Sequence, residues 1–172
     1  QDEFEKTYRF TEQGVFRQNR EPRGAGDATR PPEDWRYQVA HFYAHDLAGL
    51  ACRRLSDRLL LIYIVSAAPA LADGQPLSLC VFGKRQLHRV TLTPRGQRSL
   101  PVDYVEEQDQ TATPRQGTVE VLKFELTAEP LASDLEKPEN FSFLGLHRNI
   151  VIYLEPRHRL PVQVSGDISN VT

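Results

Sequence analysis

The sequence predicts a mainly β protein, folded as a single curled antiparallel sheet or partly open barrel with one long apolar helix. Stretches in which apolar and polar residues alternate recur along the chain, and this period of two is typical of half-buried strands. Several of these stretches are joined by short links containing Gly or Pro, which favour hairpins. We therefore expect residues 1–172 to form one domain without parallel strand–helix–strand units.

The clearest hairpin lies near the C-terminal end. Apolar residues alternate with others from Ile150 to Leu154 and again from Leu160 to Val164. Pro156 lies between the two runs and presets the backbone angle of a turn. The pattern predicts two antiparallel strands that close the sheet.

Aromatic residues mark a first strand near the N-terminus. Phe4, Tyr8 and Phe10 precede a break at Gly14, after which Val15 begins a second apolar run. We expect one strand here, with a hairpin into another.

Residues 35–43 carry the strongest strand pattern of the N-terminal half, and one of their faces is unusually aromatic. Trp35, Tyr37 and Tyr43 lie on that face. It is interpreted either as a wall of a ligand cleft or as ordinary core packing by large rings. Together with Ile62, from an apolar stretch further along, these three residues are our candidates for binding a ligand.

The apolar stretch at residues 59–65 predicts the helix. Ser56 and Asp57 are good N-cap residues, and Pro69 would end the helix, so we expect it between Asp57 and Ala68. Such a helix is apolar nearly all round and must be buried, for example as a plug in the open side of a curved sheet. Its β-branched residues leave a central strand as the alternative.

Three further strands are expected in the second half of the chain. Residues 77–82 and 87–92 alternate and are joined by the short Gly83–Lys84 link, which predicts a hairpin. Residues 118–127 alternate in the same way and predict the next strand.

Irregular loops are expected at about residues 20–34, 106–117 and 128–140, where turn-forming and polar residues gather. The first of these is rich in Pro, Gly and charged residues and is longer than the usual connection between elements. We interpret it as a candidate lid or partner-binding segment.

The two cysteines, Cys52 and Cys80, are the only redox signal in the chain. They could form one disulfide in an oxidising compartment, or they could be two small buried hydrophobic residues. No CxxC or Cys/His cluster indicates a metal site.

No group of residues indicates catalysis. His41, His45 and Asp46 could be read as metal ligands or, with His88, as the acid and base of a hydrolase, but no nucleophile motif or third ligand at a known spacing accompanies them. We therefore predict no catalytic residue, no metal and no cofactor, and lean against an enzyme.

The charge balance bears on the partners. The chain has 21 basic and 23 acidic residues and a net charge of −2, which argues against the basic footprint of a nucleic-acid or anionic-membrane protein. No apolar run reaches the roughly 18 residues that a membrane-spanning helix needs. The chain starts at Gln1 and contains no Met, which we expect of a processed or trimmed product.

Residues 160–167 (LPVQVSGD), preceded by 152–156 (IYLEP) and 143–146 (FLGL), resemble the C-terminal part of an uncharacterised family of exported bacterial proteins, the domain-of-unknown-function 3108 family. The resemblance implies an exported, periplasmic, β-rich protein of a Gram-negative bacterium, similar in shape to curled-sheet carriers of lipoproteins or lipids. It implies no site residue, because the family has no established active site.

The expected function is a non-catalytic periplasmic binding or interaction protein that holds an apolar small molecule or a partner segment on a curved sheet. The alternative is an accessory or scaffold subunit of a larger periplasmic or envelope assembly, with its long loops as docking elements. A hydrolase is the least favoured reading. The ligand or partner, the oligomeric state and the pairing of the cysteines are not set by the sequence.

Overall fold

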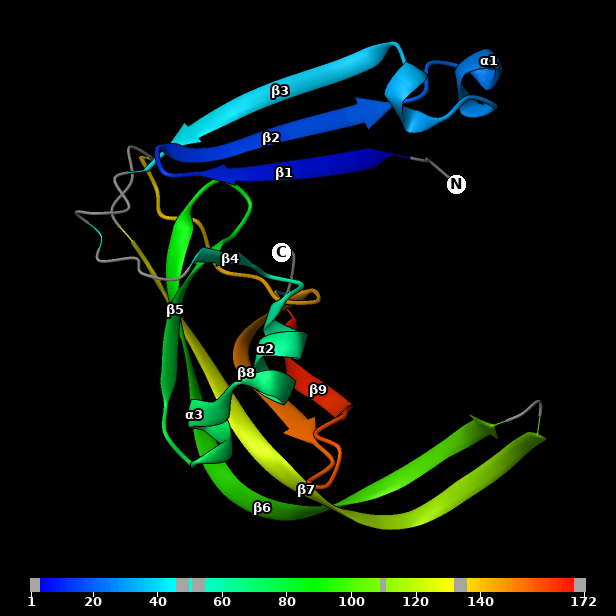
Figure 1. The fold of residues 1–172 in the computed structure, drawn as a ribbon, viewed down its shortest axis with the longest axis vertical. Helices are drawn as coiled ribbons and strands as arrows, with labels where there is room; N and C mark the ends of the chain where they lie inside the picture. Colours follow the sequence, from blue (N-terminus) through cyan, green and yellow to red (C-terminus); the bar gives the residue numbers. More distant parts are fainter. Residues whose placement is uncertain (1–3, 46–49, 51–54, 109–110, 132–135, 169–172) are drawn as a thin grey trace.

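The structure is a computed structural model, and it describes residues 4–45, 50, 55–108, 111–131 and 136–168. These residues form two β-sheets, a three-stranded sheet and a curled six-stranded sheet (Figure 1). The mainly β class is therefore confirmed. The prediction of a single sheet is wrong, because β-strands near the N-terminus form a sheet of their own among the described residues.

The three-stranded sheet is antiparallel throughout and has the order β1-β2-β3. A two-residue link joins its first two strands, and Gly14 begins the second one with a φ of 151°. A Cβ at this position would collide with the carbonyl oxygen of Tyr43, so the close approach of the third strand requires glycine. The strands are β1 (Glu5–Thr11), β2 (Gly14–Glu21) and β3 (Tyr37–Ala44).

The six-stranded sheet follows the chain order from β4 to β9, so each strand pairs with its neighbours in sequence. Its curvature makes a half-barrel, with two short helices inside the curve (Figure 1). The strands are β4 (Leu55–Asp57), β5 (Leu77–Phe82), β6 (Leu87–Gln108), β7 (Thr111–Pro130), β8 (Leu146–Leu154) and β9 (Pro161–Ile168).

One pair of strands in this sheet is parallel, against the expectation of a purely antiparallel sheet. β4 pairs with β5 in parallel register, from Leu55 opposite Cys80 to Asp57 opposite Phe82. The chain between them contains helices and is long enough for the crossover that parallel strands need. β4 has only three residues, which is too short to show a period of two in the sequence.

The predicted long helix is replaced by two short ones. α2 covers Leu61–Ala67 and α3 covers Pro69–Ala72. Ala68 between them is extended, with a ψ of 121°, because the residue before a proline is disfavoured in the helical region. Pro69 thus ends the first helix, as expected, but also begins a second one, where its fixed φ suits the first turn.

The two helices fill the concave face of the curled sheet. Leu61 and Val65 of α2 and Leu71 of α3 are buried against apolar residues of the four strands β5 to β8 and of the segment before β8. The expected plug of a curved sheet is therefore confirmed in its position, although not in its length. The sheet side of this core consists of Leu79, Val81, Val90, Leu92, Phe124, Leu126, Phe141, Phe143, Ile150, Ile152 and Leu154.

Arg159 fastens the plug to the sheet. Its guanidinium donates hydrogen bonds to the carbonyl oxygens of Ser66 and Val65, both 2.7 Å long, at the C-terminal end of α2. The same guanidinium lies over the ring of Phe124, 5.8 Å from its centroid. A cation at a helix C-terminus satisfies carbonyls that lack a partner within the helix.

The expected loop at 106–117 is wrong for its described residues, 106–108 and 111–117, because these belong to β6 and β7, which form a long hairpin. β6 and β7 pair from His88 opposite Pro130 to Gln108 opposite Thr111, with an irregularity between Pro94 and Gln97. Beyond that irregularity most side chains are exposed, and the hairpin extends away from the body as an arm (Figure 1). Because both faces of the arm are exposed to water, its strands need no alternation of apolar and polar residues. Their polar sequence therefore resembles that of a loop.

The expected loop at 128–140 is strand up to Pro130, and residues 132–135 lie outside the described part. Residues 136–140 have no regular structure, as predicted.

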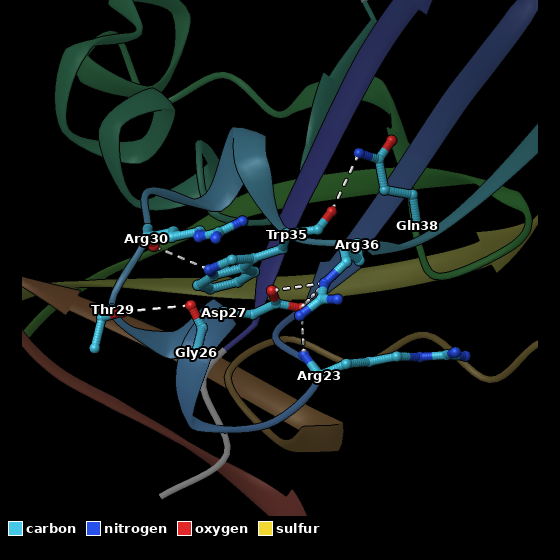
Figure 2. A network of polar contacts seen from close by, with 8 residues as sticks. All are labelled: Arg23, Gly26, Asp27, Thr29, Arg30, Trp35, Arg36 and Gln38. Atoms are coloured by element: carbon cyan, nitrogen blue, oxygen red, sulfur yellow. Dashed lines mark hydrogen bonds and ion pairs between the residues drawn. The ribbon is translucent and has the colours of Figure 1, made fainter.

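The expected loop at 20–34 is partly ordered into a knob, which we define as residues 22–36. It contains α1 (Ala25–Ala28) and a short 3₁₀ helix, η1 (Pro32–Asp34). At its centre the buried carboxylate of Asp27 accepts hydrogen bonds from the backbone N–H of Arg23 (3.1 Å) and from Nε of Arg36 (2.9 Å; Figure 2). Burial alone raises the pKa of Asp27, but these two donors and the charge of Arg36 together bring it below its usual value.

The predicted disulfide falls partly outside the described residues. Cys80 is buried on β5, and Cys52 belongs to the undescribed segment 51–54. The pairing of Cys52 with Cys80 therefore stays a prediction.

Candidate binding cleft between the two sheets

The two sheets meet through the ring of Phe82, at the end of β5. Its centroid lies 5.4 Å from that of Tyr43, 5.8 Å from Tyr8, 5.9 Å from His45 and 6.4 Å from Phe10. We call these five rings the aromatic seam. Edge-on and tilted ring pairs at such distances add to the gain from burying the rings themselves.

The register of the three-stranded sheet explains why these rings gather. Phe10, Val15 and Tyr43 are directly opposite one another across the three strands, and so share one face of the sheet. Tyr8 and Lys6 lie on the same face, two and four residues before Phe10. This face is the one turned toward the curled sheet, where Val15 is fully buried.

A cleft of about 430 Å³, which we call the junction cleft, opens beside the seam. β1 forms one wall, the turn into α2 forms another, and the tight turn before β8 closes a third side. A shallower groove of about 510 Å³ shares four of its residues and continues along Phe10 and Leu60. The junction cleft is lined by Lys6, Tyr8, Asp57, Arg58, Leu59, Phe82, Gly83, Ser142, Phe143, Leu144 and Gly145.

Hydrogen bonds hold the turn into α2 in place. Oδ1 of Asp57 accepts the backbone N–H groups of Leu59 (2.7 Å) and Leu60 (3.3 Å), so this carboxylate caps the turn. Arg58 donates from Nη1 to the carbonyl oxygen of Ser142 (3.2 Å), which ties this wall to the opposite one.

The turn before β8 places a leucine at the mouth of the cleft. Phe143 and Leu146 exchange two backbone hydrogen bonds of 2.9 Å, and the two residues between them have φ values of 52° (Leu144) and 82° (Gly145). Turns of this kind favour Asn or Gly at the first position, because other side chains are strained at positive φ. Leu144 nevertheless occupies it, and its side chain is exposed.

Two cations, Lys6 and Arg58, line the cleft beside one carboxylate, Asp57. Burial first, and then the charges of Arg17, Lys84 and Arg58, lower the pKa of Lys6. Within the described part of the chain, neither Lys6 nor Arg58 forms an ion pair. Arg58 uses one of its five N–H donors on Ser142, so the others are available to a ligand.

Two carboxylates in the same region are already engaged. Asp57 caps the turn into α2, and Glu5, which lines the groove, accepts a hydrogen bond of 3.0 Å from Arg20. Among the described residues, neither carboxylate forms an ion pair with Lys6 or Arg58. An apolar cleft with such a rim suits an anion that carries an apolar group.

The four predicted ligand-binding residues are not brought together. Trp35 is buried in the knob, where its indole N–H donates to the carbonyl oxygen of Arg30 (3.0 Å; Figure 2). Tyr37 lies under the guanidinium of Arg23, at the other end of β3 from Tyr43, and six residues of strand span about 20 Å. Tyr43 belongs to the seam, and Ile62 packs on the core of the curled sheet.

The histidines considered as metal ligands or as the acid and base of a hydrolase lie in separate places. His45 is buried against Phe82, and this burial lowers its pKa. His41 is exposed on β3, while Asp46 lies outside the described residues. His88 is fully buried, with Nε2 2.9 Å from the carbonyl oxygen of Glu139. No group of three or more His, Cys, Asp or Glu that could hold a metal ion occurs among the residues described.

Sequence reasoning missed Lys6, Arg58 and Leu144, which lie far apart in the chain. Two local signals were present. Lys6 alternates with Tyr8 and Phe10, which puts a cation on an aromatic strand face. Leu144 precedes a glycine in a short link, where a turn presents its residues to solvent.

Comparison of the chain with protein-family models, with curated proteins and with solved structures finds no match in any of the three. The resemblance to the exported family stays an expectation, and the site must be argued from its own geometry. In the described part of the chain, no helix has the length and apolar character needed to cross a membrane.

Proposed function

We propose that this protein is a non-catalytic binding protein that holds an anionic amphiphile in the junction cleft. Tyr8, Phe82 and Leu144 supply apolar surface for the hydrocarbon part of the ligand. Lys6 and Arg58 bind its negatively charged group. The observation that carries the proposal is this pair of cations, unpaired among the described residues, at the rim of an apolar cleft.

The size of the cleft limits the ligand. Small-molecule sites commonly enclose about 300 to 1,000 Å³, and the volume of about 430 Å³ lies within this range. The adjoining groove gives a second section of wall along Phe10 and Leu60. An amphiphile with one hydrocarbon chain fits this arrangement better than a lipid with two chains.

This proposal changes the expected ligand, an apolar small molecule or a partner segment, to an amphiphile with a negative charge, and it also moves the site. The expected site was the concave face of the curled sheet, but α2 and α3 occupy that face with buried side chains. An apolar ligand would have to displace them, whereas the junction cleft is open as it stands. A periplasmic location also belongs to the proposal and is supported by the resemblance alone.

Two lysophospholipids with the same acyl chain test the proposal. Titration calorimetry below their critical micelle concentrations compares lysophosphatidylglycerol, which is anionic, with lysophosphatidylcholine, which is zwitterionic. We expect saturable binding of the anionic ligand and at least about tenfold weaker binding of the other, because a charge-assisted hydrogen bond contributes about 1.5 to 3 kcal/mol. Equal affinities, or no binding of either, would contradict the proposal.

The arm favours a second candidate function, an accessory or scaffold subunit. Tyr104 and Val105 are exposed near its end, and a groove of about 580 Å³ lies between the arm and the turn that joins β8 to β9. A protruding ribbon of this kind is a docking element in many assemblies. In extracts of its own host, a stable complex that is lost on Tyr104→Ser would support this alternative.

A further inference from the structure

Exposed apolar side chains surround the mouth of the junction cleft. Leu59 is 65% exposed and Leu144 54%, and both line the cleft itself. Leu60 and Phe10 are also exposed and line the adjoining groove. Tyr63, at 70% exposure, lies in the first turn of α2, three residues after the N-cap Leu60, so the two side chains are neighbours on the helix surface. We call these five residues the apolar rim.

The apolar rim lies beside the cations of the cleft. Lys6 and Arg58 line the cleft, and the charges of Arg17 and Lys84 act on Lys6 from nearby. Arg17 also donates a hydrogen bond of 3.2 Å to the carbonyl oxygen of Lys84, which places those two residues next to each other. The net charge of −2 hides this cluster, because its members come from four distant parts of the chain.

The shape of the apolar rim favours a membrane over a flat protein surface as its partner. Leu144 stands on a two-residue turn, and Leu59 and Leu60 stand on the turn that opens α2, so these side chains project from protruding points of the backbone. Proteins that bind the interface of an anionic bilayer commonly insert projecting apolar side chains, while neighbouring Lys and Arg are attracted to the anionic lipids. Tyrosine, as at Tyr63, is favoured at the level of the lipid headgroups.

We propose that the apolar rim docks this protein on an anionic lipid bilayer, and that the amphiphile enters the junction cleft directly from that bilayer. The entry step rests on the proposed function. Because the cleft opens within the apolar rim, docking would bring its mouth to the membrane surface, and the hydrocarbon chain of the ligand would not need to cross water.

Vesicle flotation tests the docking surface. One vesicle preparation contains phosphatidylcholine only, and in the other about one third of the lipid is phosphatidylglycerol, which gives a negative surface potential. We expect the protein to float with the anionic vesicles only, and we expect the bound fraction to fall as salt is raised, because salt screens the cations of the cleft.

Tyr63→Asp is the test variant, because Tyr63 belongs to the apolar rim but does not line the junction cleft. We expect vesicle affinity to fall at least about tenfold, because a charged side chain resists burial in the interface. Lysophosphatidylglycerol binding should stay within about twofold of the wild type, since the cleft is unchanged. Tyr104→Asp is the matched control, an exposed tyrosine on the arm, and should float like the wild type.

The outcomes separate the two proposals. Binding of lysophosphatidylglycerol without vesicle binding would overturn the docking surface and leave the proposed function standing. Vesicle binding that depends on Tyr63, without lysophosphatidylglycerol binding, would support the docking surface and overturn the proposed function. Equal flotation of wild type and Tyr63→Asp, or equal binding to both vesicle types, would overturn the docking surface.

Discussion

The two sheets of this protein reach their stability in different ways. The curled sheet encloses a core to which α2, α3 and four of its strands contribute buried residues, and Arg159 fastens the helices in place. The three-stranded sheet has Val15 as its fully buried apolar residue in the described strands, and it is held to the rest mainly through the aromatic seam. The curled sheet therefore has a core of its own, whereas the three-stranded sheet depends on its contact with the curled sheet.

This difference explains where the candidate site lies. A ligand has no room inside a well-filled core, whereas the junction of two unequal sheets leaves the junction cleft and the adjoining groove. Elements with few buried apolar contacts are the ones that open locally at the lowest free energy. We therefore expect the three-stranded sheet to be the wall of the cleft that opens at the lowest free energy.

The largest effect is expected in the core of the curled sheet. Phe124→Ala removes a fully buried ring that contacts the plug and the guanidinium of Arg159. We expect the free energy of unfolding to fall by about 3 to 5 kcal/mol, as for other buried aromatic residues. Equilibrium urea unfolding checks this, and a loss below about 1 kcal/mol would show that the curled sheet does not depend on this core.

A smaller and more local effect is expected at the seam. Phe82→Ala removes the ring that joins the sheets, and the open cleft beside it lets the site collapse, so we expect a loss of about 2 to 4 kcal/mol. Amide hydrogen exchange should speed up in β1, β2 and β3 but not in β6 and β7. Phe42→Ala is the control, because its ring is exposed on the outer face of β3 and should cost less than about 0.5 kcal/mol.

Next in size is the expected effect of removing either cation of the cleft on the affinity for lysophosphatidylglycerol. Lys6→Gln and Arg58→Gln should each weaken lysophosphatidylglycerol binding about tenfold, because each removes one charged donor to the anionic group. Arg98→Gln, an exposed arginine on the arm, is the matched control and should leave the affinity unchanged. If all three variants bind alike in calorimetry, these cations do not hold the ligand.

The smallest effect is a dependence on pH. Because the pKa of Lys6 is lowered from its ordinary value of 10.5, this side chain loses its charge at a lower pH than an exposed lysine does. Binding of the anionic ligand should be strongest below that pKa and weaken as the pH rises through it. Titrations across this range check the effect. In Lys6→Gln this loss of affinity with rising pH should disappear. If the affinity of that variant still falls over the same pH range, another group causes the loss.

Much of the fold could be predicted from the sequence. The alternation at Ile150–Leu154 and Leu160–Val164 correctly predicted the hairpin of β8 and β9. The apolar run at 59–65 predicted one long buried helix, whereas the structure has two short helices and leaves Leu59, Leu60 and Tyr63 exposed. The errors occurred where periodicity has no physical basis. The arm has water on both faces, and β4 is too short to show a period.

The candidate site was much less predictable. The aromatic face at Tyr43 could be recognised, because alternation is a local signal. The junction cleft combines Lys6, Arg58 and Leu144, which approach one another only when two sheets dock, and no local pattern records that contact. The separation of Tyr37 and Tyr43, in contrast, follows from the sequence, because six residues of one strand span about 20 Å.

The central claim is that the anionic amphiphile binds where the two sheets meet. Two-dimensional ¹H–¹⁵N NMR during titration with lysophosphatidylglycerol tests it most directly, because each backbone amide reports on its own surroundings. We predict that the shifts concentrate at Lys6, Tyr8, Arg58, Gly83 and Gly145, which line the junction cleft. Shifts confined to the core of the curled sheet or to the arm, with those five amides unmoved, would contradict the claim.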